Sequence, residues 1–125
     1  AYFKGGIISY TNDVKENVLG VDSRLLEEKT AVCEEVAIAM VKGALNTLNV
    51  DFAISTTGVA GPGGGTHDIP VGTIWIACGN KDNIVTMKLE EDYGRDINLA
   101  IATSKALQLF LKYMEDNKDL FEEKY

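Results

Sequence analysis

A glycine-rich segment at residues 58–66 (GVAGPGGGT) is the part of this 125-residue chain best suited to bind a ligand. Ordering so many glycines costs conformational entropy, so a folded protein that keeps them needs their bare backbone amides close to a partner. Converging amides bind a phosphate or the oxyanion of an acyl-transfer reaction. The spacings of the known phosphate-binding loops are absent, because no Lys-Ser/Thr pair follows and no GxGxxG occurs. A flexible surface loop is therefore the alternative interpretation.

Two basic side chains could act beside this segment. Lys15 follows the first expected strand, and burial next to Tyr10 would lower its pKa from ~10.4 toward neutrality and make it a general base. A solvated lysine is the alternative. Arg95 precedes the last expected helix and could hold a phosphate or carboxylate through two hydrogen bonds. Its alternative is a surface ion pair with Glu91 or Asp92.

Composition and charge narrow the function further. The formal net charge of −7 and the lack of a basic cluster argue against nucleic-acid binding. His67 is the only histidine and has no second ligand at metal-binding spacing, so we expect no metal site. Cys33 and Cys78 fit buried thiols in a reducing compartment. With no signal peptide and no apolar run of ~20 residues, a cytoplasmic protein without membrane association is expected.

Alternating strands and amphipathic helices must position these residues. Strands are expected at residues 5–10, 51–57, 73–78 and 84–89, the last two forming an antiparallel hairpin. Helices are expected at residues 14–19, with Gly20 at the left-handed end, in a short turn capped by Asp22 or Ser23, at residues 33–48, and from Asp96 onward. The apolar stripe expected to face inward from the last helix is Ile97, Ala100, Ile101, Ser104, Leu107, Leu111 and Met114.

This pattern predicts a single α/β domain in which helices cover a mixed sheet. The chain shows no internal repeat and no linker. It opens on aromatic and β-branched residues without an initiating Met, so it looks cut from a longer chain.

Five segments, in this order, resemble the CinA C-terminal domain family: residues 3–15 (FKGGIISYTNDVK), 19–21 (LGV), 33–37 (CEEVA), 56–64 (TTGVAGPGG) and 70–73 (PVGT). The family comprises bacterial nicotinamide-nucleotide amidohydrolases, which convert nicotinamide mononucleotide to nicotinic acid mononucleotide and ammonia. The resemblance implies a three-layer α/β/α sandwich, a homodimer, a small-molecule nucleotide substrate and no cofactor.

The resemblance also implies roles for individual residues. A serine hydroxyl would attack the carboxamide, and water would hydrolyse the acyl-enzyme after ammonia leaves. Lys15 matches the lysine that takes the serine proton, and Tyr10 matches the tyrosine beside it. Thr57 matches the threonine expected to hydrogen-bond the substrate, and Arg95 matches an arginine expected to contact phosphate. The substrate-binding set implied in this way is Gly58, Gly61, Gly63, Gly64 and Arg95.

The sequence departs from the family pattern at the nucleophile. The family places that serine in a Glu-Ser-Cys-Thr-Gly-Gly stretch before the first strand seen here, and no such stretch occurs. Ser9, Ser23, Ser55 and Ser104 all lie outside the motif. We therefore expect the family's first strand and helix to be missing and the nucleophile to lie upstream of Ala1. The alternatives are a non-catalytic nucleotide-binding or regulatory module that keeps the glycine-rich segment, and a structural dimerisation domain.

Overall fold

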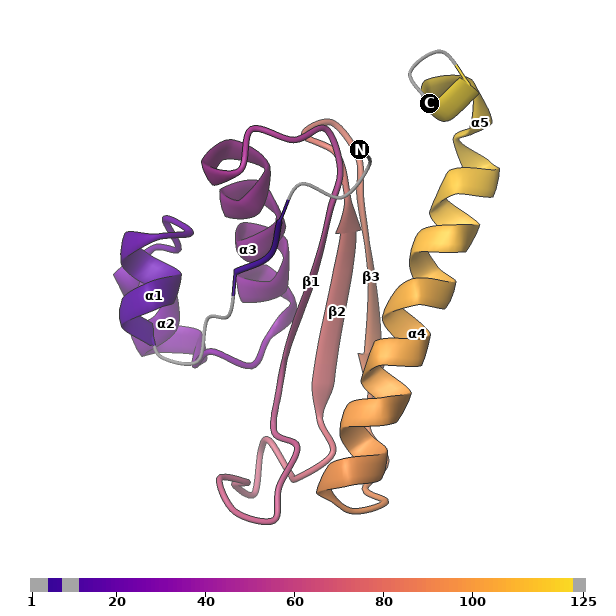
Figure 1. The fold of residues 1–125 in the computed structure, drawn as a ribbon. Coiled ribbons are helices and arrows are strands. Elements are labelled where there is room, and N and C mark those ends of the chain that lie inside the picture. The colour runs from indigo at the N-terminus through magenta and orange to yellow at the C-terminus, as the bar shows by residue number, and fades with distance from the viewer. Residues whose placement is uncertain (1–4, 8–11, 123–125) are drawn as a thin grey trace.

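A computed structural model describes residues 5–7 and 12–122 of the chain. Helices and strands make up most of the described part, and a long connection joins β1 to β2 (Figure 1). In chain order they are α1 (Asn12–Asn17), α2 (Ser23–Lys29), α3 (Glu34–Thr47), β1 (Ala53–Gly58), β2 (Ile74–Gly79), β3 (Ile84–Leu89), α4 (Arg95–Asp116) and α5 (Lys118–Glu122).

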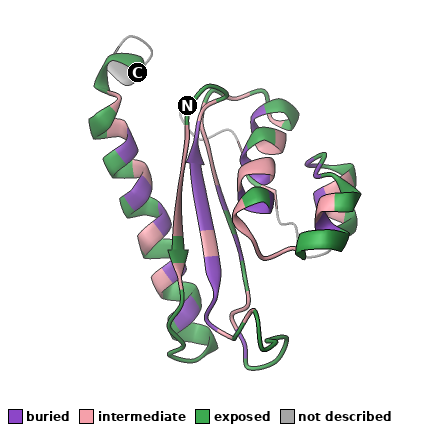
Figure 2. Cartoon of the chain, turned by 180° about the vertical axis from the view of Figure 1, so that it is seen from behind, coloured by how far each residue is buried: buried purple, intermediate pink, exposed green. Residues whose placement is uncertain are grey.

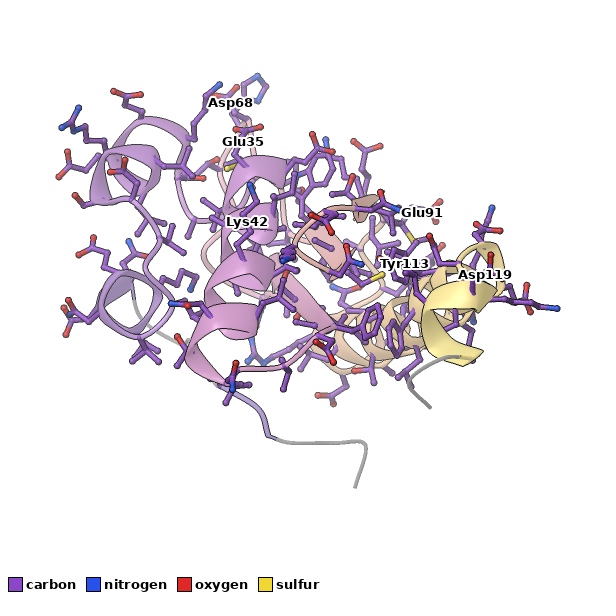
Figure 3. All side chains as sticks on the ribbon, turned by 90° about the horizontal axis from the view of Figure 1, so that it is seen from above. Glu35, Lys42, Asp68, Glu91, Tyr113 and Asp119 are labelled. Atoms are coloured by element: carbon purple, nitrogen blue, oxygen red, sulfur yellow. The ribbon has the colours of Figure 1, made fainter. Side chains whose placement is uncertain are left out.

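The strands form a sheet with β2 in the middle, between β1 and β3. Both pairings are antiparallel, with Thr57 opposite Trp75 and Ala77 opposite Thr86. Figure 3 looks along the strands and shows Lys42 of α3 and Tyr113 of α4 on opposite sides of them. The predicted α/β class and three-layer α/β/α arrangement are therefore confirmed. The parallel pairing that a mixed sheet requires is not found within residues 5–7 and 12–122.

Strand β2 carries the core because its side chains alternate between the two faces of the sheet. Ile76 and Cys78 pack against α4, with Tyr113 in the same cluster. Ala77 points the other way and packs against Val41 of α3. Figure 2 shows β2 buried along most of its length, whereas the connection between β1 and β2 is largely exposed. Helices therefore pack on both faces of the sheet, and the connection between β1 and β2 is accessible to solvent.

The predicted inward face of α4 is wrong. Leu107 and Leu111, expected to be inside, are each 56% exposed. The α4 residues that are buried are Asn98, Ala102, Ala106, Leu109 and Tyr113. Apolar residues recur along two sides of this helix, so their periodicity marks two stripes without choosing between them. The stripe with two alanines faces the sheet, where small side chains let the helix lie close to β2.

Other local expectations agree with the structure. Gly20 has the expected positive φ of 69°, and the Asp22 side chain caps α2 by accepting a hydrogen bond from the Arg24 amide at 2.9 Å. The hairpin of β2 and β3 is confirmed. For the strand expected at residues 5–10, residues 5–7 are not in a strand, and residues 8–10 lie outside the described part.

Among the described residues, no helix combines the length and the apolar character needed to cross a membrane.

Candidate functional site

The glycine-rich segment lies in the connection between β1 and β2, at the end of the sheet where α4 begins (Figure 1). Two backbone hydrogen bonds close the base of this loop. The Val59 amide donates to the Thr73 carbonyl at 2.9 Å, and the Gly72 amide donates to the Val59 carbonyl at 2.8 Å. These bonds extend the β1–β2 pairing into the loop. They fix the backbone at both ends of the glycine-rich part.

Side chains from the first turn of α4 also hold the loop. Arg95 donates from Nη1 to the Gly61 carbonyl at 2.8 Å, and Asn98 donates from Nδ2 to the Ala60 carbonyl at 3.0 Å. Within the described part of the chain, Arg95 makes no ion pair with Glu91 or Asp92. Arg95 is thus joined to the loop, as expected for a residue of the site, and its contact with phosphate stays a prediction.

Packing explains some of the loop glycines and leaves one unexplained. A Cβ at Gly58 would lie 2.6 Å from Ile74 Cγ1, and a Cβ at Gly61 would lie 2.5 Å from Val71 Cγ1. Gly61 and Gly64 also have positive φ angles of 87° and 88°. A Cβ at Gly63 would meet nothing within 4 Å, and its φ is not positive. Neither packing nor backbone conformation therefore requires glycine at position 63.

The tip of the loop presents unused hydrogen-bond donors. Gly63, Gly64 and Gly65 are exposed, and their backbone amides donate to no atom in the described part of the chain. The Arg95 guanidinium is bonded to Gly61, two residues before this run. Exposed amides and a guanidinium in the same loop region favour an anion, because both supply hydrogen-bond donors and the guanidinium adds positive charge.

Thr57 is fixed by a hydrogen bond that limits its chemistry. Its buried hydroxyl donates to the Ala31 carbonyl, in the connection between α2 and α3, at 2.7 Å. With its hydrogen engaged, the hydroxyl can only accept a further hydrogen bond from a substrate. Ser55, two residues earlier on β1, is likewise buried and donates to the Ala37 carbonyl at 2.7 Å. The inner face of β1 is thus fastened to the helical layer.

Lys15 is buried on α1, which lies on the side of α3 that faces away from the sheet (Figure 1). It is 7% exposed, so the solvated alternative is wrong. Burial lowers the pKa of its ammonium, since removing water disfavours the charged form. This is the direction that a general base needs. Tyr10, its expected companion, lies outside the described residues, so the Lys15–Tyr10 pairing stays a prediction.

Asn98 belongs to the site, and sequence reasoning missed it. Besides the bond to Ala60, its Nδ2 donates to Asp92 Oδ1 at 2.9 Å, and its Oδ1 accepts from the Tyr93 amide at 2.8 Å. The hydrogen bond from Asn98, with a second one from the Gly94 amide, lowers the pKa of Asp92. The available signal was an amide placed four residues before Ala102 in an otherwise apolar stripe.

Two other kinds of candidate site are a cavity away from the glycine-rich loop and a metal-binding cluster. A cavity of about 530 Å³ opens at the far end of the sheet, beside Lys42 and Asn80, and no expected site residue lines it. Across the residues that the structure describes, no group of three or more His, Cys, Asp and Glu side chains could hold a metal ion.

Comparison with known proteins gives one consistent family. The model of the CinA C-terminal domain matches residues 1–114. A CinA-like protein of Colwellia psychrerythraea is 40% identical over 114 residues, which are 91% of this chain and 26% of that protein. A putative competence-damage inducible protein of Halothermothrix orenii is 39% identical over 116 residues, covering 92% of this chain and 28% of the relative. The chain thus spans about a quarter of the length of these relatives.

Solved structures agree with this result. The competence/damage inducible protein CihA of Agrobacterium tumefaciens matches with a TM-score of 0.79 and 34% identity, over 82% of this chain and 64% of its own. The competence damage-inducible protein A of Klebsiella pneumoniae matches with a TM-score of 0.83 and 29% identity, over 88% and 68%. With the family model covering most of its length, this chain belongs to the CinA C-terminal domain family.

Proposed function

We propose that this domain binds the phosphate of a pyridine mononucleotide and serves the deamidation of nicotinamide mononucleotide to nicotinic acid mononucleotide and ammonia. The observation that carries the proposal is the run of amides at Gly63, Gly64 and Gly65, which donate to no atom among the described residues, in a loop whose Gly61 carbonyl is bonded by the Arg95 guanidinium. These groups suit a phosphate, which accepts several hydrogen bonds and carries negative charge.

In this mechanism Lys15 would be the general base for a serine nucleophile that we place upstream of Ala1. Its burial and lowered pKa support the role, because burial favours the neutral amine, which is the form that can accept the serine proton. Thr57 would accept a hydrogen bond from the substrate, since its own hydrogen is engaged by Ala31. The two free thiols, Cys33 and Cys78, fit the reducing cytoplasm as the compartment.

A non-catalytic nucleotide-binding module is the second candidate for the chain by itself. The observation in its favour is Ser55, whose hydroxyl is buried and donates its hydrogen to the Ala37 carbonyl. A hydroxyl held in this way is poorly placed to attack a substrate. Such a module would bind the nucleotide through the same loop and release no ammonia.

Calorimetric titration of the chain with nicotinamide mononucleotide and with nicotinamide riboside tests the binding step. The two ligands differ only in the phosphate, so we expect binding of the mononucleotide and at least a tenfold weaker binding of the riboside. Arg95→Ala should remove most of this difference, because the guanidinium contributes a charge-assisted hydrogen bond. Equal affinity for both ligands would refute phosphate recognition by this loop.

Ammonia release by the natural full-length protein tests the chemical step. We expect turnover of nicotinamide mononucleotide, a large decrease in kcat in Lys15→Ala, and a much smaller change in substrate binding. Mononucleotide binding without ammonia release would support the module instead. Unchanged turnover in Lys15→Ala would exclude this lysine from the mechanism.

A further inference from the structure

Asn98 is a buried polar side chain that connects α4 to the glycine-rich loop. It is 2% exposed, and its amide is bonded at both ends. Nδ2 donates to the Ala60 carbonyl at 3.0 Å and to Asp92 Oδ1 at 2.9 Å, and Oδ1 accepts from the Tyr93 amide at 2.8 Å. One side chain therefore joins the loop after β1 to the turn that precedes α4.

The bond to Ala60 acts together with the bond from Arg95. These two side chains, one helical turn apart on α4, hold the consecutive carbonyls of Ala60 and Gly61. Because each peptide unit is planar, fixing a carbonyl also fixes the plane of the peptide that contains it. The backbone that leads to Gly63 is thus oriented from α4, while the amides of Gly63, Gly64 and Gly65 donate to no atom of residues 5–7 and 12–122.

We propose that Asn98 is a positioning residue, which holds the loop in the conformation that presents its free amides to the anionic group of the ligand. This inference rests on the proposed function for the identity of the ligand. Position 98 requires a side-chain amide, because this side chain donates two hydrogen bonds and accepts one. A carboxylate of the same shape can only accept, and a hydrocarbon can do neither.

Asn98→Asp keeps the shape of the side chain and replaces its donors with a negative charge facing the Ala60 carbonyl and Asp92. Gln108→Glu is the matched control, since it makes the same amide-to-acid change on the exposed side of α4. Asn98→Ser, which shortens the side chain without adding charge, serves if N98D does not fold. Each variant is studied well below its own Tm.

Two measurements are made on the full chain. Hydrogen exchange of the Gly72 amide, which closes the base of the loop, reports loop opening. Calorimetric titration with nicotinamide mononucleotide reports the Kd. We expect N98D to accelerate exchange and to raise the Kd at least tenfold, with N98S changing both in the same direction. Q108E should leave both quantities within about twofold of the unaltered chain.

The pH dependence of the Kd of N98D distinguishes a positioning role of Asn98 from a general loss of structure. The N98D carboxyl lies against the Asp92 carboxylate, with the Arg95 guanidinium one turn away, and two adjacent carboxylates raise the pKa of one of them. When that carboxyl takes up a proton it regains a donor, so the Kd of N98D should recover toward the unaltered value from pH 8 to pH 5.5. Q108E should show no such recovery.

Different results overturn the two proposals. Exchange and affinity in N98D equal to those of Q108E would overturn the role of Asn98, as would loosened exchange with an unchanged Kd. Failure of the unaltered chain to bind nicotinamide mononucleotide would overturn the proposed function. In that case the Gly72 exchange rate alone decides the role of Asn98: acceleration in N98D supports it, and an unchanged rate refutes it.

Discussion

Replacing Gly63 by alanine tests whether a ligand approaches the tip of the glycine-rich loop. A Cβ at this position meets no atom within 4 Å, so the folded state accepts it without strain. The substitution reduces the freedom of the unfolded chain and should stabilise the protein by about 0.4–1 kcal/mol. If phosphate is bound by the Gly63 amide, however, the added methyl group stands beside that contact.

The expected loss of affinity follows from the hydrogen bond at risk. A hydrogen bond to a charged group contributes ~1.5–3 kcal/mol, so displacing the phosphate from the Gly63 amide should raise the Kd by about tenfold or more. We therefore expect G63A to be at least as stable as the unaltered chain and clearly weaker in binding. Stability is measured by chemical denaturation and affinity by titration with nicotinamide mononucleotide.

Gly61→Ala is the matched control, because backbone conformation and packing require glycine at position 61. A positive φ of 87° costs an alanine about 1–2 kcal/mol, and contact with Val71 Cγ1 at 2.5 Å adds about 1–3 kcal/mol. G61A should thus lose stability where G63A does not. An unchanged Kd in G63A would refute the contact at Gly63, and a G61A variant as stable as the unaltered chain would refute the loop geometry.

Two further predictions concern stability. Leu109→Ala should lower the free energy of unfolding by about 2–5 kcal/mol, because Leu109 is buried against the sheet. Leu107→Ala, on the exposed face, should change it by less than about 0.5 kcal/mol. Equal losses on chemical denaturation would contradict the orientation of α4. Because burial lowers the pKa of Lys15, the unfolded chain binds its proton more tightly, so the stability of the unaltered chain relative to Lys15→Met should rise as pH increases toward 10.5. Urea denaturation at pH 7 and pH 10 measures this difference, and parallel behaviour of the two proteins would contradict it.

Much of the fold was predictable from local patterns in the sequence. The β2–β3 hairpin follows from two β-rich runs joined by a short polar turn, and α3 follows from its apolar stripe. Gly20 and Asp22 mark helix ends because their conformational and capping preferences act within a few residues. The motifs around Lys15 and the glycine-rich segment also indicated the family, which the comparison confirms over residues 1–114.

The site was predictable only in part. Glycine content and the position after β1 indicated the loop, but composition could not separate Gly61, which packing requires, from Gly63, which packing does not. The donor role of the Thr57 hydroxyl could not be foreseen either, because its acceptor, Ala31, lies 26 residues earlier in the chain.

The sequence by itself determined the β2–β3 hairpin and the helices α3 and α4, because hydrophobic period and end-capping residues are local properties. Only the tertiary structure decided which side of α4 faces the sheet, since apolar residues lie on two sides of that helix and close packing against β2 selects the side with the alanines. It also decided that Asn98 bonds Ala60, 38 residues away. A hydrogen bond of that separation depends on how α4 and the loop meet in space, which no local pattern encodes.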